Sequence, residues 1–198
     1  MPKNYQSLET ISLTNHLPYI HAGEIPEITH IDDPALDVLI DFKSVKAITI
    51  RQNAPITDAR AKMQACGVHM LLVINQEHGV IGLITSEDIL GEKPVLAAQE
   101  KFISRAEVKV SMILTPIEKI IAISYETLRL AKVAHIIQTL NQGKQHYALV
   151  IDHKDNTNNL IIRGMFSLSQ ISKQLDKNVL DDFLPASTLA ELNRKIDN

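Results

Sequence analysis

Two short stretches of the chain place a hydroxyl side chain three residues before a carboxylate or an amide. They are Thr85 with Asp88, and Ser167 with Gln170. This spacing is typical of a capping box, in which both side chains bond the free N–H groups of a first helical turn. The same helix start could instead bind an anion or a hydroxyl-bearing ligand. Capping tolerates the amide of Gln170, whereas a ligand hydroxyl is better accepted by the carboxylate of Asp88.

A thiol and an imidazole also lie close together in the sequence, at Cys66 and His69. Such a pair could act as a nucleophile and its base. However, Cys66 continues an apolar stripe formed by Ile56, Ala59 and Met63 at helical spacing, so we expect it to be buried. No further group orients the imidazole, and the sequence has no Gly-rich phosphate loop. We therefore predict that the protein is not an enzyme.

Three histidines, His16, His21 and His30, precede the first regular pattern of the chain. Their spacing matches no common metal-ligand pattern, and no cysteine or tight carboxylate cluster supports them. We predict no metal site. The first 36 residues are expected to form an arm that packs on the main body.

The composition narrows the class of protein. The chain has 198 residues, of which 45% are hydrophobic and 4% aromatic, with a net charge of -3. It lacks the dense Lys and Arg runs that nucleic-acid binding requires, so no nucleic-acid partner is expected. A single cysteine excludes an internal disulfide and fits a reducing compartment. The longest apolar runs are too short to span a bilayer. We expect a soluble, cytoplasmic protein without a membrane partner.

The chain repeats itself, since residues 37–42 return as residues 112–117 and the same order of patterns follows both. The first copy predicts a strand at 47–50, a helix from Ile56 that Gly67 ends, and strands at 70–74 and 80–84. The second predicts a strand at 120–123, a helix that Gly143 ends, and strands at 147–151 and 160–166. The second helix should bury Leu130, Val133, Ile137 and Leu140.

The repeat divides the chain into five parts. We expect an N-terminal arm at 1–36, a first unit at 37–91, a connector at 92–109, a second unit at 110–175 and a tail at 176–198. The connector should contain a helical turn at 94–101, the tail a short helix opening at 188–191, and the loop 153–159 should be exposed and mobile.

The expected fold class is α/β (α+β), with two βαββα units related by pseudo-twofold symmetry. Each unit has too little apolar surface to fold well alone. We expect two three-stranded sheets that stack through their helices and leave paired clefts between the units.

Each unit resembles a CBS domain, the family named for cystathionine beta-synthase. The resemblance lies in the βαββα order and in the ending Gly82-Leu83-Ile84-Thr85-Ser86-Glu87-Asp88. The lead-in at 110–116 is similar to the family's Val-x-Asp-Ile-Met-Thr-Pro, from which Met112 and Leu114 depart. The resemblance covers residues 37 to 175. It implies a tandem pair, called a Bateman module, whose two clefts often hold adenine nucleotides.

The resemblance also implies which residues bind the ligand. In the first site, Asp88 would accept from the ribose hydroxyls and the helix start would face the phosphate. That site comprises Val45, Lys46, Ala47, Val68, His69, Met70, Thr85, Ser86 and Asp88. A second, weaker site comprises Thr115, Pro116, Gln145, His146, Arg163, Ser167 and Gln170. Arg163, Lys144 and Lys46 are candidate phosphate partners.

Two functions follow. The first is a stand-alone, non-catalytic regulatory module that senses AMP, ADP or ATP and needs no cofactor. As in other family members, it would form a homodimer through its helices and act on an unidentified protein partner. The alternative is a structural interaction or dimerisation module whose clefts are filled by its own side chains. The intact pair Thr85 and Asp88 favours the first function, and the missing acid at Gln170 favours the second.

Overall fold

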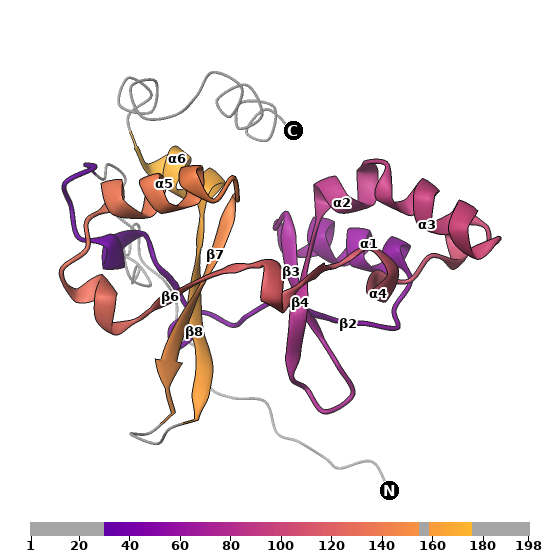
Figure 1. The fold of residues 1–198 in the computed structure, drawn as a ribbon, viewed down its shortest axis with the longest axis horizontal. Coiled ribbons are helices and arrows are strands. Elements are labelled where there is room, and N and C mark those ends of the chain that lie inside the picture. Colours follow the sequence, from indigo (N-terminus) through magenta and orange to yellow (C-terminus); the bar gives the residue numbers. More distant parts are fainter. Residues whose placement is uncertain (1–29, 155–158, 176–198) are drawn as a thin grey trace, which may run out of the picture.

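A computed structural model describes residues 30–154 and 159–175 of the chain (Figure 1). His16, His21, part of the loop 153–159 and the predicted helix at 188–191 lie outside these residues. The described chain forms two four-stranded sheets with helices beside them. The predicted mixed fold class is therefore confirmed.

The first sheet has the strand order β2-β3-β4-β5. These strands span Thr49–Arg51, Met70–Ile74, Val80–Thr85 and Thr115–Pro116. Strand β2 runs parallel to β3 and is joined to it by helix α1 (Ile56–Cys66), whereas β3, β4 and β5 are antiparallel. Helix α2 (Ser86–Leu90) follows β4 directly. The connector then forms α3 (Lys93–Lys101) and the 3-10 helix η2 (Arg105–Glu107), and α4 (Val110–Ile113) opens the second unit.

The second sheet has the order β1-β8-β7-β6. Its strands span Ile40–Asp41, Leu160–Ser167, Tyr147–His153 and Ile121–Ser124. The 3-10 helices η1 (Ala35–Val38), η3 (Ile117–Lys119) and η4 (Glu126–Arg129) lie between strands and helices. Helix α5 (Val133–Gln142) joins the parallel strands β6 and β7, and α6 (Leu168–Gln174) follows β8. This order repeats that of the first unit.

The lead-in strands β1 and β5 are exchanged between the units. Strand β1 lies near the start of the first unit but pairs with β8 of the second, and β5 lies near the start of the second unit but pairs with β4 of the first. Each sheet therefore has four strands instead of the predicted three. Equivalent glycines permit the contact, because a Cβ at Gly82 would lie 2.2 Å from the Thr115 carbonyl oxygen, and one at Gly164 would lie 2.5 Å from that of Ile40.

The two units pack through the faces of their sheets. Figure 1 shows α1 to α4 beside the first sheet and α5 and α6 beside the second. One hydrophobic cluster joins the first sheet to its helices, and another joins the second sheet to its helices. A third cluster joins the sheets to one another and includes Met70, Leu72, Leu83, Leu149 and Met165. The predicted packing through helices is therefore wrong, because the central strands are apolar on both faces and need cover on each side.

Two residues of the predicted helix stripes lie outside the core. Cys66 is exposed because it is the last residue of α1, beside Gly67, whose φ of 64° turns the chain away. Leu130 is 94% exposed, because the chain forms the separate turn η4 before α5 begins at Val133. Leu128 of η4 is buried in its place. Ile56, Ala59, Met63, Val133, Ile137 and Leu140 are buried as predicted.

Candidate functional site

Two pockets lie where residues of the two units meet. The Asp88 pocket has a volume of about 370 Å³ and is lined by Leu83, Thr85, Glu87, Asp88, Thr115, Ile120, Lys144, Gln145, His146 and Tyr147. The Gln170 pocket has a volume of about 360 Å³. It is lined by residues of the segment from Ile40 to Ile48, of the turn between α1 and β3, and of β8 and α6, among them Met165, Ser167, Ser169, Gln170 and Lys173. Both volumes are in the range of small-molecule sites.

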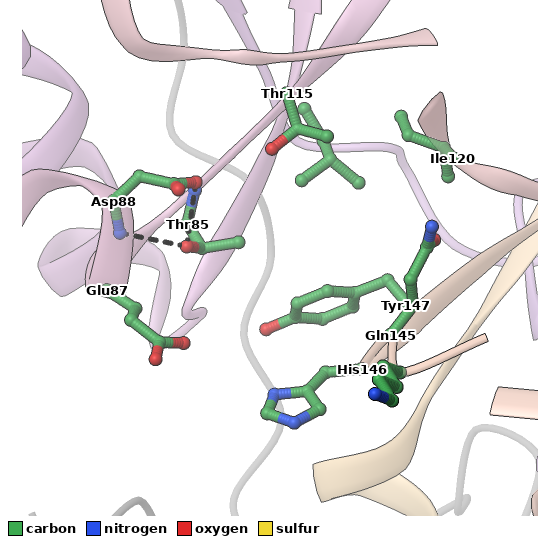
Figure 2. A pocket seen from close by; sticks show the side chains of 10 residues that line it. Thr85, Glu87, Asp88, Thr115, Ile120, Gln145, His146 and Tyr147 are labelled. Atoms are coloured by element: carbon green, nitrogen blue, oxygen red, sulfur yellow. Dashed lines mark hydrogen bonds between the residues drawn. The ribbon is translucent and has the colours of Figure 1, made fainter. Parts of the chain in front are cut away.

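The helix start in the Asp88 pocket is a closed capping box (Figure 2). The Thr85 hydroxyl accepts from the Asp88 backbone N–H at 3.1 Å. In return, Asp88 Oδ2 accepts from both the backbone N–H and the hydroxyl of Thr85, each at 2.8 Å. Lys93 Nζ donates to the remaining oxygen, Oδ1, at 2.5 Å. The capping interpretation is therefore confirmed, and both oxygens of this buried carboxylate already have partners.

Tyr147 lines both pockets. In Figure 2 its phenol oxygen points from the start of β7 toward the start of α2. Burial, together with the smaller effect of the nearby carboxylates of Glu87 and Asp88, raises the pKa of Tyr147 to about 12. The ring is therefore a neutral wall that the two pockets share.

The side chain of Gln145 forms hydrogen bonds with the backbone on the opposite side of the Asp88 pocket. Its Oε1 accepts from the Ile121 N–H at 3.0 Å, and its Nε2 donates to the Lys119 carbonyl at 2.6 Å. The side chain thus fixes the entry to β6. A ligand would have to break these bonds to engage the amide.

The helix start in the Gln170 pocket is open. The Ser167 hydroxyl accepts from the Gln170 backbone N–H at 3.4 Å and lies 2.9 Å from the Ser169 hydroxyl. Within residues 30–154 and 159–175, the side-chain amide of Gln170 has no recorded hydrogen bond. This amide, unlike the Asp88 carboxylate, remains available.

The opposite wall of the Gln170 pocket is largely apolar. It includes Phe42, Ala47, Val68 and Met70, together with Val45 at the rim. Two exposed lysines, Lys46 and Lys173, lie on the same pocket and have no ion-pair partner among the described residues. An apolar slot, a polar helix start and two cations therefore surround one space.

The two pockets group the predicted site residues differently from the two expected sites. The structure joins Thr85 and Asp88 to Thr115, Gln145 and His146, which were predicted for the second site. It joins the segments 45–47 and 68–70 to Ser167 and Gln170. Each helix start faces strand entries of the other unit, because the sheets pack face to face. Of the predicted residues, Ser86, Pro116 and Arg163 line neither pocket.

Arg163 is engaged elsewhere and is not placed to bind a phosphate. Its Nε and Nη2 donate to the two carboxylate oxygens of Asp41 at 2.7 and 2.8 Å. Its Nη1 donates to Asp152 at 3.2 Å. The guanidinium centre lies 4.5 Å from the centroid of the Tyr125 ring. These partners use its donors inside the second unit.

Cys66 and His69 both line the Gln170 pocket. The expectation that Cys66 is buried was the main reason to reject a catalytic pair, and it is wrong. The described residues nevertheless show no hydrogen bond between the thiol and the imidazole. Without that bond and a third group that orients His69, the pair lacks the arrangement that activates a nucleophile.

Sequence reasoning missed several residues of the pockets. Tyr147 follows two predicted site residues directly, and Lys173 lies one helical turn after Gln170, so both carried a local signal. No local signal in the sequence points to Phe42, because this residue reaches the pocket only through the exchange of β1. Ser169 shows its role only when its contact with Ser167 is seen.

Comparisons with known proteins bear on the first unit and on the fold. The family model described as the CBS domain matches residues 36–94. This part of the chain is therefore a CBS domain. The fold of the described chain also occurs in an uncharacterized conserved protein from Pyrococcus horikoshii, at TM-score 0.50 and 17% identity, over 72% of this chain and 91% of the other.

Two further solved structures share the fold. A CBS-domain-containing protein from Agrobacterium tumefaciens has a TM-score of 0.51 and 14% identity, over 73% of this chain and 94% of the other. A CBS-domain protein of unknown function from Thermoplasma acidophilum has a TM-score of 0.50 and 16% identity, covering 73% and 74%. A search of the curated proteins gave no match. At these identities the structures support the fold alone.

Two further observations concern metal ions and membranes. Among residues 30–154 and 159–175, no cluster of three or more His, Cys, Asp and Glu side chains is arranged to hold a metal ion. None of the helices in this part of the chain combines the length and apolar character needed to cross a bilayer.

Proposed function

We propose that this CBS-domain protein is a non-catalytic regulatory module that binds AMP, ADP or ATP in the Gln170 pocket. One observation carries the proposal, namely that an apolar slot and an open polar helix start face one another across a single cavity. Nucleotide binding would change how the two units sit against each other and thereby signal to a protein partner. A cytoplasmic location is part of this proposal.

The slot supports binding of a base. Ala47, Val68 and Met70 provide apolar surface on the side of the first unit. A purine is flat and mostly apolar on its faces, so such a slot would remove it from water favourably. The small side chain of Ala47 leaves room for the ring.

The opposite wall supports binding of the sugar and the phosphate. The hydroxyls of Ser167 and Ser169 and the amide of Gln170 can exchange hydrogen bonds with ribose hydroxyls. Lys46 and Lys173 can neutralise the phosphate, because neither has an ion-pair partner in the described chain. An amide accepts less strongly than a carboxylate, so ribose recognition depends more on the serines.

The Asp88 pocket is the less favourable of the two in this proposal. A ribose there would have to displace Lys93 from Asp88, or share oxygens that already cap α2. Thus the order of the two sites is opposite to the one expected from the missing acid at Gln170.

Titration calorimetry with AMP, ADP, ATP and S-adenosylmethionine tests the proposal. Lys46→Glu and Lys173→Glu should each weaken nucleotide binding, whereas Lys62→Glu, on the exposed face of α1, should not. A ligand at a hundredfold its dissociation constant should also stabilise the wild type by about 2.7 kcal/mol. Absence of binding for all four compounds would refute the nucleotide proposal.

The alternative, an interaction or dimerisation module, is favoured by a separate observation. The α2–α3 region exposes Leu90, Val95, Leu96 and Phe102, and Phe102 is 96% exposed. Neighbouring exposed apolar side chains are typical of a contact surface. We propose that a homodimer forms through these helices. Sedimentation should then give a dimer that Leu96→Glu with Phe102→Glu dissociates, while the exposed Leu160→Glu, on β8, leaves it intact.

A further inference from the structure

A largely buried ion pair between Arg163 and Asp41 joins the exchanged strand β1 to β8 of the second sheet. The side chain of Arg163 is 12% exposed and that of Asp41 is 22% exposed. Two parallel bonds of 2.7 and 2.8 Å make the contact bidentate, which fixes orientation as well as distance. These bonds hold the pKa of Asp41 below its ordinary value, so the carboxylate stays charged at neutral pH.

Asp41 also organises the chain that follows β1. Its carbonyl oxygen accepts from the backbone N–H groups of Ser44 and Val45, both at 2.9 Å. Its Oδ1 accepts from the backbone N–H of Lys43 at 2.8 Å. The Phe42 N–H in turn donates to the Arg163 carbonyl at 2.9 Å. The turn from 41 to 45 therefore depends on the position of one residue.

This turn supplies one wall of the Gln170 pocket. Ile40, Phe42, Val45 and Lys46 all line it, although β1 itself pairs over only two residues. So short a strand has few ladder bonds to hold it in register. The bidentate ion pair to Arg163 is an additional restraint on β1.

We infer that Arg163 is a positioning residue for the ligand of the Gln170 pocket, although it lines neither pocket. By holding the Asp41 carboxylate, it fixes the turn that places Phe42, Val45 and Lys46. The effect on affinity rests on the proposed nucleotide function, whereas the effect on the turn does not.

Asp152 offers a matched control. It accepts from the same guanidinium, at 3.2 Å, and its side chain is also 22% exposed. However, it lies in β7, near the loop that joins β7 to β8, and does not line the Gln170 pocket. Asp41→Asn and Asp152→Asn thus remove the same charge from the same arginine, and only the first acts on the turn.

The test measures amide hydrogen exchange over residues 42–48 and nucleotide affinity in the full chain. Asp41→Asn should speed exchange and weaken binding, each by about tenfold, and Asp152→Asn should change both by less than about twofold. Arg163→Lys, which keeps the charge but not the bidentate contact, should give intermediate values. It also serves as the test variant if Asp41→Asn lacks a cooperative melting transition.

Two results separate the possible failures. Unchanged exchange over 42–48 in Asp41→Asn, or an equal effect of Asp152→Asn, overturns the positioning role whether or not nucleotides bind. If the wild type binds no nucleotide, the proposed function fails, and faster exchange confined to Asp41→Asn still supports the positioning role.

Discussion

The Asp88 pocket and the Gln170 pocket occupy equivalent places in the two repeats but differ in what their helix starts still offer a ligand. In the first, Thr85, Asp88 and Lys93 satisfy one another. In the second, Ser167 caps the helix alone and the Gln170 amide remains open. The comparison teaches that a well-matched motif can be fully used by the fold, while the more divergent copy leaves a polar side chain without a bond inside the described chain.

The strongest way to break this comparison is to fill the apolar slot. Ala47→Phe should lower nucleotide affinity by at least about a hundredfold, because the new ring occupies the space proposed for the base. Ala122→Phe, at an exposed position of β6, is the matched control and should bind normally. Calorimetry on both variants checks this. Equal affinities would move the ligand out of the Gln170 pocket.

Truncating Asp88 and Gln170, which each follow a capping hydroxyl by three positions, should affect stability unequally. Asp88→Ala should lower the free energy of unfolding by about 2 kcal/mol, since it removes the acceptor of the Thr85 backbone N–H, the Thr85 hydroxyl and Lys93. Gln170→Ala should lower it by less than about 0.5 kcal/mol, because its side chain has no recorded bond to lose. Urea denaturation measures both changes. Comparable losses would mean that the two starts are structurally equivalent.

The pH dependence of stability tests the electrostatic environment of Tyr147, the residue that lines both pockets. The pKa of Tyr147 is raised to about 12 in the folded protein, so the folded state keeps a proton that the unfolded chain releases near pH 10. Stability from this group is complete below pH 10 and is lost as the pH rises toward 12. Between pH 9.5 and 11 the wild type should lose about 1 kcal/mol more than Tyr147→Phe. Parallel denaturation curves would show that the phenol is not in a carboxylate-rich, buried position.

The smallest expected effect concerns Cys66, the single cysteine of the chain, which lines the Gln170 pocket. A bound nucleotide should slow its alkylation by about threefold through partial cover of the thiol. Mass spectrometry with and without nucleotide measures the rate, and Asp88→Ala should retain the protection.

A Cys66→Ser variant should match the wild type in lacking nucleotide turnover. Turnover by the wild type that this variant loses would contradict the non-catalytic proposal.

Local patterns were sufficient for most of the secondary structure. The stripe of Ile56, Ala59 and Met63 predicts α1, and Gly67 ends it as expected, because these signals act within a few residues. Gly143 likewise closes α5, although the left-handed residue there is Lys144, with a φ of 51°. A Cβ at Gly143 would lie 2.3 Å from Ile121 Cδ1, so packing explains this glycine.

Apart from the helix ends at Cys66 and Leu130, the errors concern relations between distant parts of the chain. Strands of two residues, such as β1 and β5, have no periodicity that could indicate their partners. Their exchange adds the fourth strand to each sheet, and the face-to-face packing assigns Asp88 and Gln170 to pockets opposite to those predicted. Arg163 resembled a free surface cation, because nothing in the sequence indicates that Asp41, 122 positions away, is its partner.

The exchange of β1 and β5 has a consequence for how this protein could be divided or rebuilt. A cut within the connector would leave each fragment with the other's edge strand and with an unpaired β4 or β8 at its own sheet edge. We expect the two fragments to be stable only when they associate and restore both four-stranded sheets. The smallest unit that can evolve or be engineered as a whole is thus the pair.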